Sequence, residues 1–477
     1  MRQFEFETNQ IVATPTRIGI LFLGRKRPGF DPEWGAKIDR LVLQQFEDGA
    51  DEIFVPPKAV DRSTLESAVQ ACRSERCDVI VMLQTTMSDG RLAPFLAQAW
   101  GLPLVLWATP EKPDGDMISS CSLVGVHVFA STLRQLALPF EIVYGAPGDA
   151  KTVAEVKEAV ARAAQGVEAE RAPARPSARS MKPLAGSSVG LIGYHAPGFI
   201  NLHADPAALS RELGVQLRHF GLQELLDQMD HCNEQDVAHD LELVHALKLP
   251  LVDVEDSDLA VQSKTYLALK RMAQQEHLDA LAVRCWPELP NLSGQWPYFA
   301  MVRLTSEGFP MAMEGDVDGA LTCLLGERLG FGPGYLTDWL EHEGSRMTLW
   351  HPGNAPFQLC EPVGEPHGPR LARHFNIRKP MVVAARLKAP QAITLFRLWR
   401  CDDRYHLAAF NANTVPPDRE LQGSHGVADV PDTDLHALFK RLCREGMPHH
   451  LAVSPGHHAT KLRDFANQTG IRDHSDG

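Results

Sequence analysis

Apolar and polar positions follow two different periods along the first 164 residues. Apolar runs at residues 17–23, 77–83 and 102–107 have the length and composition of buried strands, and residues 51–55 are expected to form a short strand. Between them, residues 34–46, 63–72 and 92–100 place apolar side chains three or four positions apart, which is the spacing of one helix face. Strands that alternate with helices in this way predict a parallel sheet covered by helices on both faces.

Residues 165–184 interrupt this alternation. They are rich in Ala, Arg, Pro and Ser and have no apolar period, which predicts a linker. The α/β pattern then restarts, with expected strands at 188–193 and 278–283 and expected helices at 222–229, 265–276 and 320–329. The two α/β segments therefore resemble two copies of one architecture, although no residue-level repeat connects them.

The pattern of apolar and polar residues changes again from about Arg346. Short apolar runs at 347–350, 381–387, 392–399 and 405–410 are separated by turns, and no long helix follows until 435–444. This spacing predicts an antiparallel β domain, either a sandwich or a barrel. The expected fold is thus two doubly wound, Rossmann-like α/β domains (1–164 and 185–345) joined by the linker, then a β-rich C-terminal domain (346–477). The polar tail from Gly470 to Gly477 is expected to fray.

Composition narrows the possible locations and partners. The 477 residues are 44% hydrophobic and 22% charged with a formal net charge of -13, and the longest basic run is Arg25–Arg27, so a nucleic-acid partner is not expected. No apolar segment reaches the roughly 18 to 20 residues that span a bilayer, and the N-terminus lacks the order of a signal peptide. Nine scattered cysteines without a CxxC pair are typical of reduced core cysteines. A cytoplasmic protein without a membrane partner is expected.

The first candidate site is the acidic stretch from Met311 to Ala320. Glu314 follows a short apolar run and precedes a helix, and carboxylates at strand ends are where open α/β folds bind ligands. Glu314 is not at a usual capping position, which favours a site role. Asp316 and Asp318 are better interpreted as caps of the helix that begins near Gly319.

Two further stretches carry metal-ligand residue types. Asp338 lies among bulky apolar residues and, if buried, needs a partner or a metal ion, although alone it would be interpreted as a turn residue. The run from 448 to 458 holds four histidines, and imidazole suits transition metals. Surface histidines or a chance run are the alternatives, and one or two ligands at most are expected among His449, His450, His457 and His458.

Common catalytic motifs are missing from the chain. The spacing of these residues matches no zincin, P-loop or EF-hand pattern, and no GxSxG occurs. The strand–turn segment GLIGYHAPGF lacks the GxGxxG order of a dinucleotide site and has a proline where the helix should begin. Hydrolase and NAD-dependent functions are therefore not expected.

At the candidate stretches the chain resembles the L-fucose isomerase family and, more loosely, L-arabinose isomerase. The family's Glu-x-Asp segment is matched at Glu314, its later Asp at Asp338, and its C-terminal His in a run before Gly-His at His450. In that family the Glu, the Asp and the His hold a divalent, manganese-type ion. The resemblance therefore implies Mn²⁺, or another divalent transition metal, bound by these three residues.

Softer matches in the same family imply substrate contacts. Gly24-Arg25 resembles a turn that contacts substrate, which implies this role for Arg25. Cys285-Trp286 resembles a pair at a strand end and implies the same role for Trp286. The match in the histidine run implies it for His457. His351 lies in a segment similar to the family's His-Cys-Gly stretch, with Pro352 in place of Cys. The resemblance also implies a homo-oligomer, while these departures leave the sugar unspecified.

The implied reaction interconverts an aldose and a ketose through a metal-stabilised enediolate. Glu314 and Asp338 would bind the ion and serve as base and acid, and a divalent ion would stabilise the charge as a Lewis acid. Two other interpretations stay open from the sequence. One is a different enzyme on the same scaffold, such as a lyase, epimerase or transferase acting on a substituted sugar. The other is a sugar-binding protein without turnover.

Overall fold

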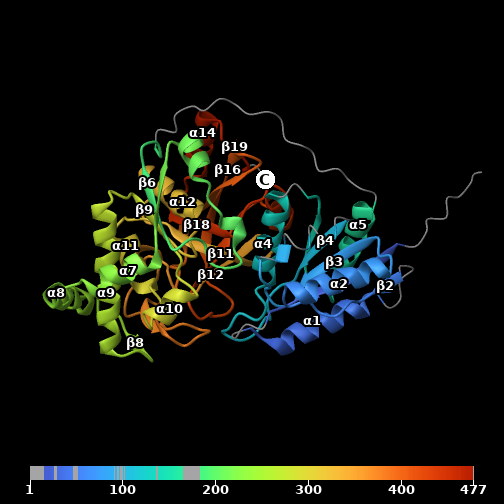
Figure 1. Cartoon of the computed structure of the whole chain (residues 1–477), viewed down its shortest axis with the longest axis horizontal. Coiled ribbons are helices and arrows are strands. Elements are labelled where there is room, and N and C mark those ends of the chain that lie inside the picture. Colours follow the sequence, from blue (N-terminus) through green and yellow to red (C-terminus); the bar gives the residue numbers. More distant parts are fainter. Residues whose placement is uncertain are drawn as a thin grey trace, which may run out of the picture.

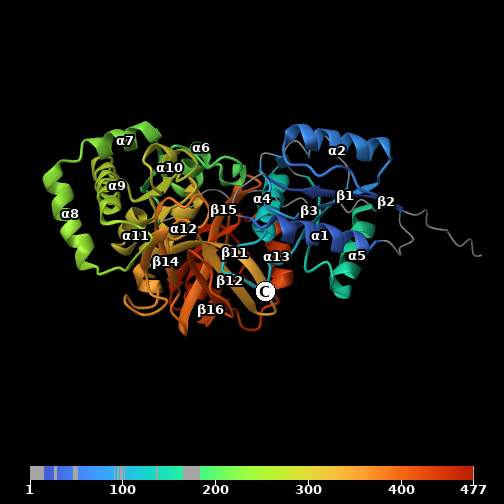
Figure 2. The same cartoon turned by 90° about the horizontal axis from the view of Figure 1, so that it is seen from below.

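The computed structural model describes residues 16–25, 30–46, 52–90, 92–93, 96, 100, 103–135, 138–164 and 183–475. These residues form two parallel sheets and one large, mostly antiparallel sheet. Figures 1 and 2 show the two α/β units at opposite ends of the molecule, with the strands of the large sheet between them. This order confirms the expected fold class.

The first sheet has the strand order β2-β1-β3-β4-β5 and is parallel throughout. Its strands are β1 (Arg17–Leu23), β2 (Glu52–Phe54), β3 (Val79–Gln84), β4 (Leu104–Ala108) and β5 (Glu141–Tyr144). The helices α1 (Pro32–Gln44) and α5 (Ala150–Ala164) share one apolar cluster with the sheet, and α2 (Arg62–Ser74) and α4 (Ser122–Gln135) share the other. Helices therefore cover both faces, as continuous apolar strands require.

Short polar side chains begin the helices of this unit. Asp31 accepts hydrogen bonds from the backbone N–H groups of Glu33 and Trp34 at the start of α1. Asp61 and Thr64 form a reciprocal capping box at the start of α2. Each cap satisfies backbone donors that the first helical turn leaves unpaired, so these residues fix where the helices begin.

The second sheet has the order β10-β9-β6-β7 and is also parallel. Its strands are β6 (Ser188–Ile192), β7 (Gln216–Phe220), β9 (Ala280–Val283) and β10 (Met311–Ala312). Counted along the chain, both sheets place their strands in the order second, first, third, fourth. The two α/β units thus share one topology, as the repeated alternation of expected strands and helices predicts.

Helices of the second unit pack on one another and on the barrel. They are α6 (Pro206–Ala208), α7 (Leu222–Asp230), α8 (Glu234–Ala246), α9 (Asp256–Gln275), α10 (Glu288–Leu292), α11 (Tyr298–Ser306) and α12 (Val317–Arg328). The helix α12 contacts β6, β9 and β10 of its own unit and also β11, β15 and β18 of the large sheet. Its side chains are buried nearly all round, which is expected of a helix between two layers.

The large sheet closes on itself into a barrel. Its strands β16-β15-β18-β11-β12-β17 are neighbours in that order, and β17 pairs back with β16. They are β11 (Tyr335–Glu343), β12 (Arg346–His351), β15 (Gln391–Cys401), β16 (Arg404–Val415), β17 (Ser424–Asp429) and β18 (His450–Pro455). The sequence left sandwich and barrel open, and the β16–β17 pairing decides for the barrel.

Further elements extend the barrel sheet or cover it. The strands β14 (Pro380–Arg386), β13 (Arg370–Arg373) and β8 (Leu251–Val252) continue beyond β17, and β19 (Arg472–Asp473) joins β16. The helix α13 (Leu435–Arg444) contacts α4 and β11, and α14 (Ala459–Thr469) contacts β16.

The structure differs from the sequence expectations at the C-terminal tail and at the start of the β-rich domain. The expectation of a frayed tail is wrong up to residue 475, because β19 pairs with β16 and His474 and Ser475 are buried. The strand β11 pairs with β12 and β18 although it precedes residue 346, where the β-rich segment was expected to begin. The expected linker lies outside the described residues except for 183–184, as does part of the helix expected at 92–100.

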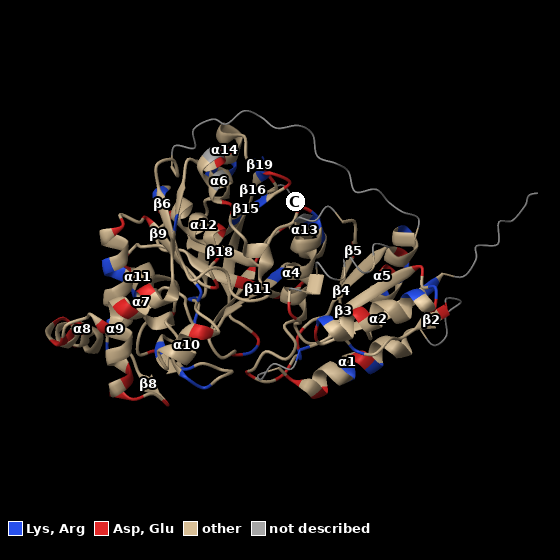
Figure 3. Ribbon diagram, viewed as in Figure 1, with Lys and Arg blue, Asp and Glu red and all other residues tan. Residues whose placement is uncertain are grey.

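The last features of the fold are the distribution of charged residues and the length of the apolar helices. Figure 3 shows Lys and Arg interspersed with Asp and Glu along the outer helices α1, α2 and α5. Within the described residues, no helix is both long and apolar enough to cross a bilayer. The cytoplasmic location and the homo-oligomeric state remain predictions.

Candidate metal centre and cleft

A cleft with about 550 Å³ of open space lies where the three units meet. The N-terminal unit contributes an apolar wall of Phe30, Met87, Ile118, Cys121 and Val124. Phe30 follows β1, Met87 follows β3, and the other three lie in the segment that leaves β4 and enters α4. The carboxyl edge of the first sheet therefore faces the cleft, as is usual for ligand sites in open α/β sheets.

The carboxyl edge of the second sheet also faces the cleft. Phe199, Trp286 and Glu314 follow β6, β9 and β10 respectively, and all three line the cleft with Trp296 and Tyr298. The ring of Trp286 meets that of Phe199 edge to face, with centroids 5.6 Å apart. Its indole N–H donates a hydrogen bond of 2.7 Å to Oε1 of Glu314. Trp286, expected to contact substrate, thus also holds one oxygen of the candidate ligand Glu314.

The barrel unit supplies the remaining wall. Its cleft-lining residues are Asp338, Trp350, His351, Pro352, His374, Phe375, Asn376 and His449. Six of these eight residues end or follow the strands β12 and β13. Aromatic and carboxylate side chains from three units therefore border one space, which is the usual composition of a small-molecule site.

The backbone at Glu314 is held in an unusual conformation. Glu314 has a φ of 61° and Gly315 a φ of 72°, both in the left-handed region. A Cβ at position 315 would lie 2.2 Å from the carbonyl oxygen of Tyr194, so only glycine fits there. The carbonyl of Glu314 accepts from Ala196 N–H at 2.7 Å, and Gly315 N–H donates to Val283. Strained residues of this kind cluster at functional sites.

Strand register brings Asp338 and His450 together. On the antiparallel strands β11 and β18 the two residues are direct partners, and Trp350 on β12 is the partner of Asp338 on the other side. Direct cross-strand partners point their side chains to the same face of a sheet. Nε2 of His450 accordingly lies 3.7 Å from Oδ1 of Asp338.

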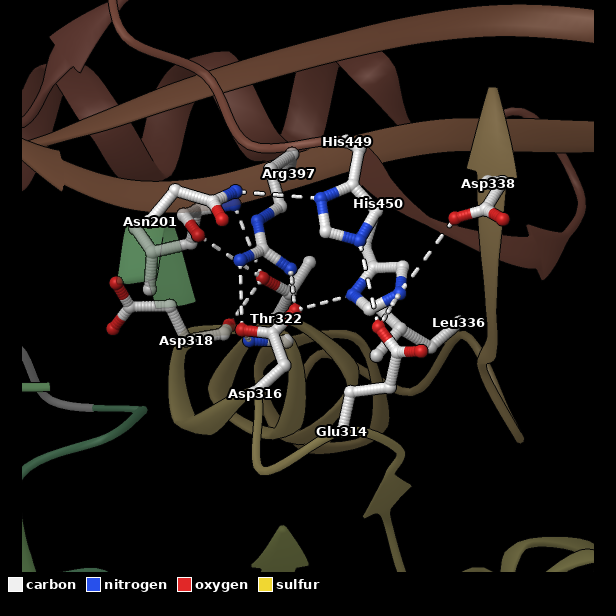
Figure 4. A network of polar contacts seen from close by, with 12 residues as sticks. Asn201, Glu314, Asp316, Asp318, Thr322, Leu336, Asp338, Arg397, His449 and His450 are labelled. Carbon is white, nitrogen blue, oxygen red and sulfur yellow. Dashed lines mark hydrogen bonds and ion pairs between the residues drawn. The ribbon is translucent and has the colours of Figure 1, made fainter. Parts of the chain in front are cut away.

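Glu314, which belongs to the second α/β unit, approaches His450 from the side opposite the barrel strands (Figure 4). Its Oε2 atom lies 3.6 Å from Nε2 of His450 and 3.6 Å from Nε2 of His449. These three atoms are buried and form no hydrogen bond with any described residue. The structure thus brings together Glu314, Asp338 and His450, the three residues predicted as ligands.

The electrostatics of this cluster favour a cation. Burial alone would lower the pKa of His450, but Asp316, Glu314 and Asp338 outweigh it and raise that pKa above its ordinary value. Burial opposes ionisation of Glu314, yet the neighbouring histidines lower its pKa to about 2. A negative field that binds a proton at His450 also attracts a metal ion.

Two more histidines, His449 and His351, lie close to the predicted ligands, and the sequence did not show which further histidines would do so. One group of donor atoms within 4.8 Å of one another comprises Glu314, His449 and His450, and a second comprises Asp338, His351 and His450. Burial and the neighbouring His450 lower the pKa of His449 to about 4 and that of His351 to about 3, so both rings are neutral near pH 7. Neutral imidazoles offer lone pairs to a metal ion.

The residues Asp316 and Asp318 differ in their roles. Asp316 caps α12 by accepting from Gly319 N–H at 2.8 Å, which confirms the expected cap, and it also contacts Nδ1 of His450 at 2.8 Å. Asp318 is not a cap, because it lies inside the first turn and accepts from the hydroxyl of Tyr405 at 3.1 Å. Burial raises the pKa of Asp318 to about 6.

Other predicted site residues lie away from the cleft walls. The backbone N–H of Arg25 lies 3.3 Å from the hydroxyl of Thr86, and Arg25 does not line the cleft. His457 donates from Nε2 to the carbonyl of Ala412, and His458 stacks on Phe331. Neither histidine lines the cleft, so within the run from 448 to 458 only His449 and His450 reach the cluster.

The chain is similar to known sugar isomerases. Residues 203–329 match the L-arabinose isomerase central domain family. A sulfoquinovose isomerase of Priestia aryabhattai is 25% identical over 446 residues, covering 92% of this chain and 94% of that protein. An L-arabinose isomerase of Acidothermus cellulolyticus is 24% identical over 363 residues, covering 73% and 68%. The chain is similar to L-arabinose isomerase and to related sugar isomerases.

The family match lies in the middle of the chain. The matched segment holds Glu314 and the whole of α12, whereas Asp338 and His450 lie beyond it. Among solved structures, a fructose-binding periplasmic domain matches with 13% identity and a TM-score of 0.16, over 57% of this chain and 73% of that one.

Proposed function

We propose that this chain is a divalent-metal-dependent isomerase that interconverts an aldose and a ketose. The observation that carries the proposal is the convergence of Glu314, Asp338 and His450 at the border of an aromatic cleft, which Glu314 and Asp338 line. The relatives named as sulfoquinovose and L-arabinose isomerases support the same reaction class.

The donor set suits a transition-metal ion. Two carboxylates and an imidazole are ligands of Mn²⁺, Fe²⁺ or Zn²⁺, and imidazole is uncommon around Mg²⁺ or Ca²⁺. The buried Oε2 of Glu314 and Nε2 of His450 form no hydrogen bond within the described residues, which would cost free energy without a partner. Glu314, Asp338 and His450 would hold the ion, and His351 and His449 lie close enough to complete its shell.

Isomerisation moves a proton between C1 and C2 of the sugar. When bound, the divalent ion supplies Lewis-acid stabilisation for the negative charge that develops as this proton leaves. Glu314 and Asp338 approach from opposite layers, so one carboxylate can remove the proton while the other returns a proton at the neighbouring atom. The N–H of Trp286 holds Oε1 of Glu314, which leaves Oε2 on the side of His450.

The walls of the cleft suit a sugar. Aromatic rings such as Trp286, Trp350 and Tyr298 offer apolar faces for the C–H bonds of a sugar ring or chain. His351, His374 and Asn376 offer polar groups for hydroxyls at the same walls. A few polar groups in an aromatic pocket fix the orientation of a ligand and supply its specificity.

Solvent deuterium exchange tests this function. The protein is incubated in heavy water with Mn²⁺ and a panel of aldoses and ketoses, including L-arabinose and sulfoquinovose, and each mixture is followed by NMR. We expect deuterium at C1 or C2 together with aldose–ketose conversion, and loss of both on addition of a chelator.

Other outcomes identify the rival functions. Deuterium at C2 with an epimeric aldose and no ketose would replace isomerisation with epimerisation. Tight sugar binding without deuterium incorporation in any member of the panel would contradict the enzyme and favour a sugar-binding protein.

A further inference from the structure

A buried ion pair lies directly behind His450. Arg397 on β15 donates from its two terminal nitrogens to the two oxygens of Asp316, at 2.7 and 2.9 Å. Both side chains have no exposed surface. Figure 4 shows the pair on the side of His450 away from Asp338. An arginine in the middle of an apolar barrel strand therefore has one carboxylate as its bidentate partner.

The remaining contacts of Asp316 fix the direction of its hydrogen bond to His450. Guanidinium and backbone N–H groups only donate, and Asp316 accepts two bonds from Arg397 and one from Gly319. Its carboxylate is therefore the acceptor in the 2.8 Å contact with Nδ1 of His450, and Nδ1 carries the hydrogen.

This hydrogen decides what the other ring nitrogen can do. A neutral imidazole with its hydrogen on Nδ1 has a lone pair on Nε2. Nε2 of His450 is the atom that lies 3.6 Å from Glu314 and 3.7 Å from Asp338. The opposite tautomer would place a hydrogen on Nε2 and remove the donor lone pair from the cluster.

We propose that Asp316 and Arg397 form a positioning pair that keeps His450 in the Nδ1–H tautomer, with the Nε2 lone pair aimed between Glu314 and Asp338. The inference rests on the proposed function, because it assigns the pair to the ion that these residues hold. Asp316 orients the ring and increases the basicity of Nε2. Arg397 fixes the plane of the Asp316 carboxylate through two parallel bonds.

The chain contains a matched control for this pair. Arg303 on α11 donates to both oxygens of Asp240 on α8, at 2.6 and 2.8 Å, and both side chains are nearly as buried. Neither residue lines the cleft, and the ring of Tyr266 covers the guanidinium at 3.7 Å. The two pairs share geometry and burial, and only the first contacts a histidine of the cluster.

The test compares Mn²⁺ affinity in two pairs of variants. Asp316→Asn and Arg397→Met remove one partner near His450, and Asp240→Asn and Arg303→Met remove one partner in the control. Free Mn²⁺ is measured by electron paramagnetic resonance, and folding is checked by circular dichroism. We expect Mn²⁺ to bind about 10- to 100-fold more weakly in the first two variants, as for other outer partners of metal ligands. The control variants should lose thermal stability and keep the wild-type affinity.

The ring tautomer gives a second measurement that needs no destabilised variant. In Zn²⁺-loaded wild-type protein labelled with ¹⁵N-histidine, the His450 signals are assigned by their loss in His450→Ala. We expect a hydrogen on Nδ1 and none on Nε2.

Each contrary result has a distinct meaning. A hydrogen on Nε2, wild-type Mn²⁺ affinity in folded Asp316→Asn, or an equal loss of affinity in Asp240→Asn would overturn the positioning role alone. Wild-type protein that binds no divalent ion would overturn the proposed function and this inference with it.

Discussion

Two buried groups of histidine and carboxylate side chains differ in what their donor atoms face. In the cleft, Nε2 of His450 points at Glu314 and Asp338 without a hydrogen bond. At the C-terminal tail, His406, His474 and Glu445 also bring donor atoms within 4.8 Å of one another. There, Nδ1 of His406 and Nε2 of His474 are hydrogen-bonded to each other at 2.9 Å.

The direction of the hydrogen bond between the two tail histidines follows from the second bond of His406. Nε2 of His406 donates to the carbonyl of Cys401, so its Nδ1 accepts and His474 donates. Arg472 forms an ion pair with Glu445 at 3.1 Å, which places a cation beside the carboxylate. Neither of the two nitrogens that face each other in this bond then has a free lone pair for an ion.

The pKa shift of His450 is opposite in sign to those of the two tail histidines. Burial first, and then neighbouring positive groups, lower the pKa of His406 to about 3 and that of His474 to about 4. The carboxylates around His450 raise its pKa despite its burial. Both groups contain the same residue types. The direction of their hydrogen bonds and the charges around them are what set the candidate metal centre apart from the tail group.

The largest expected difference between the groups is in catalysis. Glu314→Gln and Asp338→Asn each remove a carboxylate that would transfer protons, so we expect turnover to fall by about 10²- to 10⁴-fold. Glu445→Gln makes the same chemical change in the tail group and should leave turnover near the wild-type rate. Initial rates of ketose formation by the purified, folded variants measure this, and near-normal activity in either cleft variant would contradict the assignment.

A smaller difference is expected in the pH dependence of stability. Because the folded-state pKa values of His406 and His474 lie below the ordinary value of about 6.5, the unfolded chain binds more protons between pH 6.5 and about 3 to 4. The stability they contribute is complete above pH 6.5 and declines as the pH falls, by about 1.4 kcal/mol per pH unit for each group. His450 has the opposite sign, since its raised pKa stabilises the fold below pH 6.5 and this contribution is lost as the pH rises.

Melting temperatures of metal-free protein between pH 4 and 7 measure this contribution. His474→Gln removes a titrating group from the tail and should give a shallower decline with falling pH than the wild type. An identical decline in the two proteins would show that His474 does not exclude protons in the folded state.

Much of the fold is predictable from the sequence, because continuous apolar runs identify strands wherever they lie. The strands β1, β3, β6 and β9 agree with the expected runs within about two residues, and β14 and β15 were also expected. The strand β18 was missed since its first residues were interpreted only as a histidine run. Barrel closure depends on the pairing of β16 with β17, which local pattern does not contain.

The candidate site was only partly predictable for a similar reason. The register of β11 on β18 places Asp338 opposite His450, and no local signal reports register between distant strands. A lone Arg397 in the apolar run 392–399 was a usable signal, since a buried charge needs a partner. The histidine run alone could not tell which of its members face the cleft.

Ion binding by the wild-type protein tests the central claim most directly. Metal-free protein is titrated with Mn²⁺ under electron paramagnetic resonance, in parallel with His450→Ala and His474→Ala. We predict one tightly bound ion per chain in the wild type and in His474→Ala, and binding weakened by at least about 10²-fold in His450→Ala, because a direct ligand should contribute at least as much as an outer partner. Equal affinity in all three proteins, or no bound ion in the wild type, would contradict the account.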